Sequence, residues 1–438
     1  PPPPPPPFFF QSEDGIRYFV ASRGVGVVYK TQVIYSTIYL NTHLHISPYQ
    51  HGFLTGKSTI TNLMIVTQYI SEELDKGGQV DVIYTDFSSA FDRVDHNLLL
   101  NKLSFFGMSP SFIKLIESYL VARINYVFYN GYLSHEYVST SGVPQGSNLG
   151  PLLFILFIDD LLRALTCPRL GFADDLKIYS SIDNLNDMKL LQDNLDMIYR
   201  WSVENKILLN IIKCCFVTFT RKINHLFSAY YINDQNLIKN DTVKDLGVVF
   251  DSQLTFSEHI ETLVSSASKS LGFVIRISKY FRTPALFKSF YFCFVVSKLE
   301  YAAVIWSPYY LQYELIIERI QRRFLKFMSF KLYGYFPERT MEYSALLDQH
   351  KFQSLVMRRD MHSAKFLWKI VHNRVDCPHI LSMINFYVPR LNNRHAVTFY
   401  LPKPKTNMLK KSPITNLYRC ANKLYDDIFA NGIKQITF

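Results

Sequence analysis

Two acidic sites at the ends of expected strands constrain the fold of this chain more than any other feature. Residues 80–85 form an alternating, strand-like run that Asp86 closes, and 171–175 (GFADD) has the form of a hairpin turn. A loop rich in glycine and proline, 142–147, lies between them. Phosphoryl transfer uses two divalent cations about 3.5–4 Å apart, and hard Mg²⁺ prefers carboxylate oxygens. An isolated Asp-Asp pair is usually a solvated turn, which would leave the accompanying strand and loop unexplained.

Five stretches occur in a fixed order along the chain. They are 84–92 (YTDFSSAFD), 141–162 (SGVPQGSNLGPLLFILFIDDLL), 172–175 (FADD), 209–214 (LNIIKC) and 244–248 (KDLGV). Together they resemble the reverse transcriptase of non-LTR retrotransposons of the jockey-like kind, from about Gln50 to near the C-terminus. The resemblance implies an α+β right-hand polymerase with a ferredoxin-like palm, truncated fingers, a helical thumb and a mostly helical C-terminal region.

The resemblance also assigns a metal site. Asp86 and Asp174 would bridge two Mg²⁺ ions, with Mn²⁺ as a possible substitute, and Asp175 would complete the carboxylate cluster. The main-chain carbonyl of Phe87 would be an additional ligand. We therefore expect Asp86, Asp174 and Asp175 to be the catalytic residues.

Further residues are expected to bind the nucleotide. Phe91 follows Asp86 by five residues, and an aromatic ring there would exclude a ribose 2′-hydroxyl; the alternative is a core phenylalanine. Gln145 and Gly146 match the family loop beneath the template–nucleotide pair, where glycine permits close backbone approach. Lys213 matches a position near the triphosphate, although a solvated lysine at a strand end remains the alternative.

Lys57 lies in a glycine-containing stretch that is similar to a phosphate-binding loop. Gly52 and Gly56 enclose three residues, whereas that loop requires four, so the sequence does not predict it. The resemblance places this stretch in the fingers, near template and nucleotide. Leu54 stands where relatives often have arginine, which leaves Lys57 as the candidate phosphate contact.

Hydrophobic periodicity predicts the order of the elements. We expect a helix over 60–74, a strand to Asp86, and a second helix capped by Ser88 or Ser89, with Asp92 and His96 as helix-stabilising groups one turn apart. The elements that follow are a β-rich stretch at 126–138, the 171–179 hairpin, a helix over 185–205, strands at 215–219 and 243–250, and helices at 258–280, 284–304 and 313–331. The core order is a split βαβ arrangement, as in a polymerase palm.

The expected domains follow from these elements. Residues 21–79 would be partial fingers, 80–250 the palm, 251–333 the thumb and 334–438 a basic C-terminal region. Residues 1–20, which begin with seven prolines, are interpreted as a translated sequence artefact, with a polyproline ligand segment as the alternative.

Charge is distributed unevenly along the chain. Of the 47 Lys and Arg and 36 Asp and Glu that give a net charge of +11, residues 1–220 hold 16 and 20, and residues 221–438 hold 31 and 16. The basic second half indicates a polyanionic partner, although ordinary surface lysine and arginine could give the same balance. The expected nucleic-acid contacts lie on the 313–331 helix: Arg319, Arg322, Arg323 and Lys326.

Six cysteines without CxxC spacing argue against a zinc site or a disulfide framework and favour reduced thiols in an intracellular protein, nuclear or cytoplasmic. No apolar run is long enough for a membrane span.

The sequence therefore predicts RNA-templated DNA synthesis, with an RNA template, a DNA primer and dNTPs as partners. One alternative is a catalytically impaired remnant that only binds nucleic acid; another, a template-dependent RNA polymerase, is disfavoured by Phe91. About 50 residues precede the first matching motif. We expect the fingers to be incomplete, no upstream endonuclease, and little or no activity from the chain alone.

Overall fold

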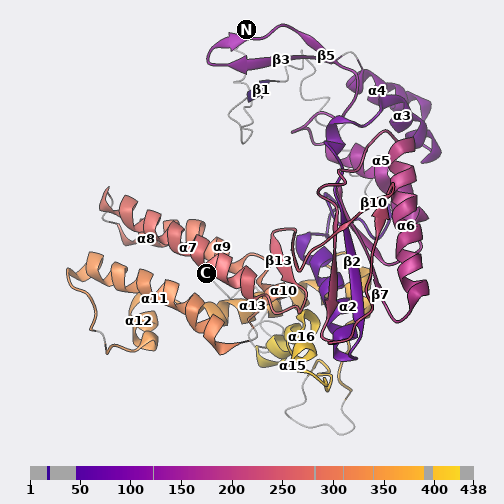
Figure 1. Cartoon of the computed structure of the whole chain (residues 1–438). Helices are drawn as coiled ribbons and strands as arrows, with labels where there is room; N and C mark the ends of the chain where they lie inside the picture. The colour runs from indigo at the N-terminus through magenta and orange to yellow at the C-terminus, as the bar shows by residue number, and fades with distance from the viewer. Residues whose placement is uncertain are drawn as a thin grey trace.

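The computed structural model describes residues 17–19, 46–121, 123–280, 283–308, 310–338, 340–388 and 398–424. The described chain forms an open arc with the main sheet in its middle (Figure 1). One end of the arc carries α3 (His96–Phe105), α4 (Pro110–Leu120) and the strands β3 (Arg123–Tyr129) and β5 (Tyr137–Ser139). The other end carries the helices α7 (Ser257–Ile277), α8 (Pro284–Tyr291) and α11 (Leu311–Tyr333). Residues 21–45, the first part of the segment 21–79 predicted to form the fingers, and most of residues 1–20 lie outside the described residues.

A five-stranded sheet forms the centre of the molecule. Its order is β11-β8-β2-β7-β6, with β2 and its neighbours β7 and β8 antiparallel, β6 antiparallel to β7, and β11 parallel to β8. The strands are β2 (Gln79–Thr85), β6 (Arg169–Phe172), β7 (Asp175–Ser181), β8 (Cys215–Thr220) and β11 (Ile238–Lys239). This is the split βαβ order. The predicted ferredoxin-like palm is thus confirmed.

Helices cover both faces of this sheet. Val80 and Val82 of β2 belong to a core that includes α2 (Thr59–Asp75), whereas Ile83 faces the core of α5 (Gly150–Ala164) and α6 (Leu185–Glu204). Because side chains of a strand alternate between faces, β2 is covered on both sides and six of its seven residues are buried. Ser58 closes a capping box at the start of α2, which fixes where that helix begins.

The second predicted helix is divided in the structure. Ala90–Asp92 forms only a 3-10 turn, η1, and α3 runs from His96 to Phe105 with Asp95 as its N-cap. The prediction that Ser88 or Ser89 caps this helix is therefore wrong. Asp95 accepts a hydrogen bond from the Leu98 amide, and Ser89 has a left-handed φ of 51° without a side-chain cap.

The remaining elements of this end of the arc form a small second sheet. Its strands are β1 (Arg17–Phe19), β3 (Arg123–Tyr129), β4 (Tyr132–Leu133) and β5 (Tyr137–Ser139), and α4 (Pro110–Leu120) comes before β3 in the chain and packs on α3. Strand β1 pairs with β3, so at least these three residues of the segment set aside in the sequence take part in the fold.

The single strand expected over 243–250 is a hairpin. Strands β12 (Thr242–Asp245) and β13 (Val248–Asp251) pair antiparallel around Leu246 and Gly247, whose φ values are 43° and 87°. Glycine adopts that conformation readily, so Gly247 lets the chain reverse. A second small hairpin, β9 (Tyr231–Ile232) with β10 (Gln235–Asn236), packs beside α6.

The rest of the described chain is helical. It comprises α7 (Ser257–Ile277), η2 (Ser278–Tyr280), α8 (Pro284–Tyr291), the π-helical turn η3 (Phe292–Val296), α9 (Ser297–Glu300), α10 (Ala303–Trp306), α11 (Leu311–Tyr333), α12 (Tyr343–His350), α13 (Leu355–Val371), α14 (Pro378–Ser382), α15 (Asn407–Lys410) and α16 (Pro413–Lys423). One apolar core joins α2, the sheet, α7–α11 and α12–α16. The C-terminal helices therefore support the palm directly. No helix in the described part is both long and apolar enough to cross a membrane.

Candidate active site

The three predicted catalytic carboxylates lie at one edge of the central sheet. Asp86 follows the last residue of β2, and the β2–β7 register pairs Thr85 with Leu176, so one step further Asp86 stands opposite Asp175. The β6–β7 hairpin pairs Phe172 with Asp175 and leaves Asp174 in its turn. Strand register alone therefore brings together the residues that the sequence separates by almost ninety positions.

These carboxylates repel one another. Burial, followed by the charges of Asp174 and Asp245, raises the pKa of Asp175 to about 6. Burial, together with the charge of Asp86, also raises the pKa of Asp174. A divalent cation would relieve this repulsion, so the donor chemistry fits Mg²⁺. Among the described residues, no three acidic, histidine or cysteine side chains already converge on one metal position.

The segment before β8 holds Asp86 in place. The Asp86 carbonyl accepts a hydrogen bond from the Asn210 amide at 2.8 Å, and the Cys214 Sγ lies 3.4 Å from the Asp86 amide. Lys213 Nζ lies 3.6 Å from the Asp86 carboxylate. The Phe87 side chain is buried against Trp201, which leaves its carbonyl as the group predicted to bind metal.

Gln50 clamps the hairpin turn, a role that the sequence did not reveal. Its Oε1 accepts hydrogen bonds from the amides of His51, Gly52 and Ala173 at 2.8–3.0 Å, and its Nε2 donates to the Ala173 carbonyl at 3.3 Å. Ala173 has a left-handed φ of 57°, which for a residue with a Cβ costs about 1–2 kcal/mol. Gln50 thus holds the strained residue that aims Asp174.

Close contact between segments explains one glycine in this region. A Cβ on Gly52 would lie 2.4 Å from the Ala173 amide nitrogen, so only glycine lets the 49–52 segment run along β6. The glycine-containing stretch after Gln50 is visible in the sequence, but a local pattern cannot show which distant segment it contacts.

Phe91 lies between two other aromatic rings. It stacks on Phe154 of α5 with ring centroids 4.4 Å apart, and meets Phe53 edge-on at 6.3 Å. Phe53 is 58% exposed, so this aromatic group faces solvent on one side. The position is compatible with the predicted sugar contact and also with partial core packing.

The 142–147 loop docks onto the turn that carries Phe91. The amides of Gly142 and Val143 donate to the carbonyls of Val94 and Phe91, and a Cβ on Gly142 would lie 2.7 Å from backbone atoms of Asp92. The loop and the turn are therefore one unit.

Gln145 and Gly146 are positioned by that unit. Gln145 Nε2 donates to the Asp92 carboxylate at 2.9 Å, and His96 Nε2 lies 2.9 Å from the Gly142 carbonyl. The prediction that Asp92 and His96 stabilise a helix one turn apart is thus wrong, because each side chain contacts the 142–147 loop and Asp92 precedes α3. Gly146 has a φ of 78°, a conformation that favours glycine.

Lys57 is engaged by backbone groups. Its Nζ donates to the carbonyls of Pro48 and Gln50 at 2.8 and 3.0 Å, and burial lowers its pKa. These bonds fix the segment that carries Gln50. Its predicted phosphate contact stays a prediction.

A buried ion pair next to the carboxylates was also missed. Lys177 of β7 pairs with Asp245 of β12, and both side chains are at most 5% exposed. Because an isolated buried charge is costly, this pair fixes the β12–β13 hairpin against the central sheet.

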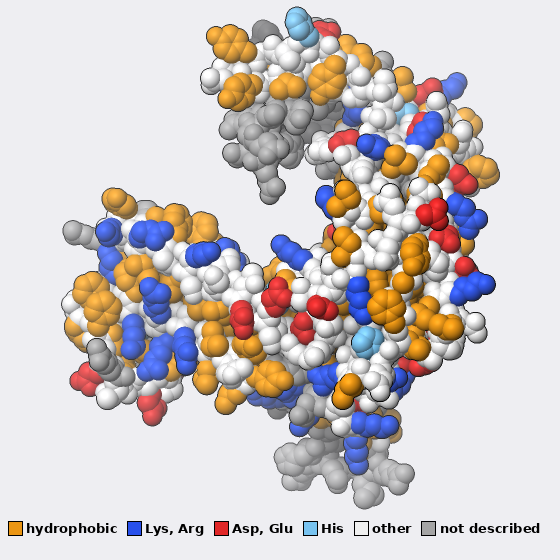
Figure 2. All heavy atoms as spheres, viewed as in Figure 1, with side chains coloured by type: hydrophobic (Ala, Val, Ile, Leu, Met, Phe, Trp, Pro, Cys, Tyr) orange, Lys and Arg blue, Asp and Glu red, His pale blue; other side chains and the backbone are white. Residues whose placement is uncertain are grey.

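The predicted nucleic-acid residues lie on α11. Arg319 and Arg323 are exposed, Arg322 donates to the Met341 carbonyl at 2.9 Å, and Lys326 is half-buried. Figure 2 shows Lys and Arg side chains gathered over the arm formed by α7, α8 and α11.

The fold and the site together define a class of protein. A ferredoxin-like palm with carboxylates at the ends of two adjacent strands, joined by a helical arm, is the catalytic framework of right-hand nucleic-acid polymerases. Residues 29–250 match the family described as reverse transcriptase (RNA-dependent DNA polymerase). The chain belongs to that family.

Curated relatives agree with this assignment. The chain is 34% identical over 230 residues to the RNA-directed DNA polymerase from mobile element jockey of Drosophila funebris, covering 50% of this chain and 25% of that protein. It is 32% identical over 222 residues to the probable RNA-directed DNA polymerase from transposon X-element of Drosophila melanogaster, covering 48% and 24%. The chain spans about a quarter of the length of these relatives.

Among solved structures, an apo telomerase from Candida tropicalis gives a TM-score of 0.42 at 10% identity, over 90% of this chain and 55% of that chain.

Proposed function

We propose that this chain is the polymerase part of a non-LTR retrotransposon protein that synthesises DNA on an RNA template from a DNA primer and dNTPs. The observation that carries the proposal is the meeting of Asp86, Asp174 and Asp175 at one sheet edge, within a chain of the reverse transcriptase family. Relatives named as RNA-directed DNA polymerases support the same reaction.

The carboxylates would hold two Mg²⁺ ions, or Mn²⁺ in their place. When bound, such ions lower the pKa of an attacking hydroxyl and stabilise charge on the transferring phosphate. Asp86 and Asp174 would supply the bridging oxygens, with Asp175 and the Phe87 carbonyl beside them. Burial and the charges of neighbouring carboxylates raise the pKa values of Asp174 and Asp175, which fits this role because a bound cation would offset both effects.

The neighbouring residues would select and orient the nucleotide. Phe91 would lie against the sugar and leave no room for a 2′-hydroxyl, while Gln145 and Gly146 would support the templating pair from the docked loop. Lys213, beside Asp86, would place its ammonium near the triphosphate. Arg319, Arg322, Arg323 and Lys326 of α11 would contact the phosphates of the template–primer duplex.

Primer extension on an RNA template with dNTPs and Mg²⁺ tests the proposal, in a protein that carries complete fingers upstream of the palm. Asp86→Asn and Asp174→Asn each keep the side-chain shape and remove one formal charge, so extension should fall by several orders of magnitude while template binding remains. Asp183→Asn, an exposed change in the loop after β7, is the matched control and should extend as wild type does.

A second outcome would favour the remnant interpretation. If wild type binds template–primer but extends nothing with either Mg²⁺ or Mn²⁺, and the Asp86 and Asp174 variants behave identically, the chain only binds nucleic acid. Normal extension by Asp174→Asn would instead show that the proposed site is wrong.

A further inference from the structure

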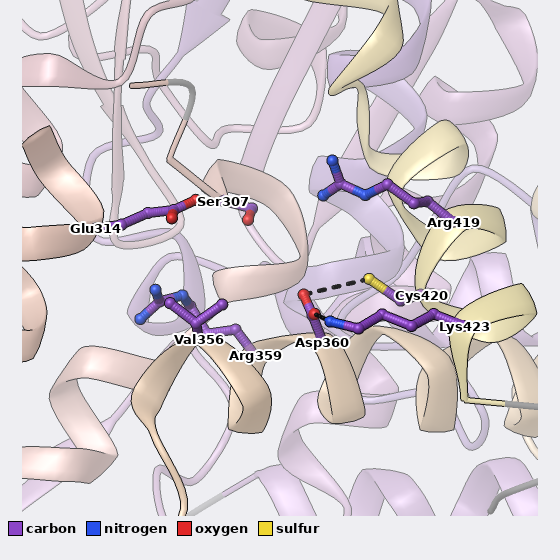
Figure 3. A pocket seen from close by; sticks show the side chains of 8 residues that line it. All are labelled: Ser307, Glu314, Val356, Arg359, Asp360, Arg419, Cys420 and Lys423. Carbon is purple, nitrogen blue, oxygen red and sulfur yellow. Dashed lines mark hydrogen bonds and ion pairs between the residues drawn. The ribbon is translucent and has the colours of Figure 1, made fainter. Parts of the chain in front are cut away.

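Helices α13–α16 lie beyond the residues that match the reverse transcriptase family, yet they pack beside the palm. Of these, α14, α15 and α16 contact α2, and α2 contacts β6 of the hairpin that carries Asp174 (Figure 1). Figure 3 shows Asp360 of α13 beside Lys423 and Cys420 of α16, with which it bonds at 2.8 and 3.5 Å. The C-terminal helices are therefore tied to one another and connected to the catalytic hairpin through α2.

A strap of chain, residues 47–58, leads into α2 and holds the turn of the catalytic hairpin. Gln50 of the strap binds both the amide and the carbonyl of Ala173, the residue before Asp174. Lys57 Nζ, near the other end of the strap, donates to the Gln50 carbonyl at 3.0 Å. The two ends of the strap are thus tied together, so a shift at its far end is transmitted to the turn.

The turn before α14 docks onto that far end. The Asp376 amide donates to the Gly56 carbonyl at 3.0 Å. A Cβ on Gly56 would lie 2.6 Å from the Asp376 Cβ and 2.7 Å from the Asp376 amide nitrogen, and Gly56 has a φ of 78°. Glycine alone suits both the left-handed backbone and so close an approach. Burial lowers the pKa of Lys57, and nearby Cys377 and Asp376 oppose that shift, which places the same turn beside the Lys57 ammonium.

A second set of contacts holds α2 itself. Asp75, the last residue of α2, accepts hydrogen bonds from the amide and the hydroxyl of Thr406 at 2.7 Å each. In the first turn of α2, the fully buried Asn62 donates through Nδ2 to the Gly171 carbonyl of β6 at 3.0 Å. Helix α2 therefore bonds the C-terminal region at one end and the catalytic hairpin at the other.

We propose that the C-terminal region holds Asp174 in position at the metal site, with the turn at Asp376 acting through the strap and the segment at Thr406 acting through α2. This inference rests on the proposed polymerase function. Gly56 and Asp376 are positioning residues, because they act through Gln50 and Ala173. Loss of their contact lowers the turnover number and the affinity for metal, and leaves the affinity for template–primer unchanged.

Gly56→Ala and Gly77→Ala separate positioning from backbone strain. Gly77 has a φ of 77° and no atom within 4 Å of an added Cβ, so both variants carry the same left-handed strain but only Gly56→Ala presses on Asp376. In a protein with complete fingers, kcat for primer extension should fall about 10–100-fold in Gly56→Ala and stay within about 2-fold in Gly77→Ala. The Kd for template–primer should stay at the wild-type value in both variants.

Manganese binding reports the same displacement without turnover. Titration of the full chain followed by electron paramagnetic resonance, with template–primer and dNTP present, should show Mn²⁺ binding weakened by about 10-fold or more in Gly56→Ala and unchanged in Gly77→Ala. If Gly56→Ala does not fold, Asp75→Ala takes its place and should also weaken Mn²⁺ binding. Asp75→Asn keeps an acceptor oxygen for Thr406 and should restore that binding.

The two assays distinguish failure of this inference from failure of the proposed function. Equal kcat and equal Mn²⁺ affinity in Gly56→Ala and Gly77→Ala, with an active wild type, would overturn the inference and leave the polymerase function standing. A wild type that extends no primer would refute the polymerase function. Weaker Mn²⁺ binding in Gly56→Ala than in Gly77→Ala would still support the positioning of Asp174 by the C-terminal region.

Discussion

Replacing Gln50 with alanine should destabilise the protein and weaken the carboxylate site together, because one buried carboxamide supports both. Gln50 is fully buried, and its Oε1 accepts from three backbone amides, those of His51, Gly52 and Ala173. Its Nε2 also donates to the Ala173 carbonyl. Alanine removes every one of these bonds.

The expected magnitude follows from the groups left without partners. Each buried donor that loses its acceptor costs about 1–3 kcal/mol. The His51 amide keeps the Gly171 carbonyl as an acceptor at 2.9 Å, so only the amides of Gly52 and Ala173 are left without one. The lower end applies here because water can enter the space that the carboxamide vacates, which gives a loss of about 2 kcal/mol in the free energy of unfolding. Ala173 would also be free to leave its left-handed conformation, which would displace Asp174.

Urea unfolding and primer extension measure the two effects. Gln235→Ala, on exposed strand β10, is the matched control and should change the free energy of unfolding by less than about 0.5 kcal/mol. A Gln50→Ala protein with wild-type stability and wild-type extension would refute the reasoning that this side chain holds the turn.

Other changes address charge, sugar selection and nucleic-acid binding. Without divalent cations, Asp175→Asn should raise Tm at pH 8. The pKa of Asp175 is about 6 in the folded state against an ordinary 3.8, so folding becomes less favourable as pH rises through that interval. The gain in Tm should vanish below about pH 4, and an equal gain at every pH would contradict this reasoning. Phe91→Val opens space without removing charge, so it should retain part of dNTP incorporation and admit rNTPs; unchanged discrimination would show that Phe91 is not the sugar gate. Log affinity for RNA–DNA duplex should fall linearly with log salt, and the Arg319→Gln, Arg323→Gln double variant should reduce that slope by up to about 2; a flat salt dependence in wild type would exclude a phosphate-binding arm.

The palm could be predicted from the sequence because its signals are local. The alternating run before Asp86, the turn at Asp174 and the amphipathic helix over 185–205 each specify one element, and the order of these elements fixes the strand arrangement. Antiparallel pairing then brings Asp86 opposite Asp175 without further information.

The supporting contacts could not be predicted, because they join residues that are far apart in the sequence. Nothing in the sequence near Gln50 indicates that it would bind Ala173. The buried pair of Lys177 and Asp245 likewise becomes visible only in the folded structure. Asp92 had helical spacing to His96, but docking of the 142–147 loop decided its role. Tertiary contacts of this kind override local preference.

Manganese binding followed by electron paramagnetic resonance tests the central claim most directly, since it reports on the carboxylates without requiring turnover. With template–primer and dNTP present, wild type should bind two Mn²⁺ ions, and Asp174→Asn and Asp86→Asn should each lose tight binding while Asp183→Asn keeps it. Equal Mn²⁺ binding by wild type, Asp174→Asn and Asp86→Asn would contradict the assignment of this sheet edge as the catalytic metal site.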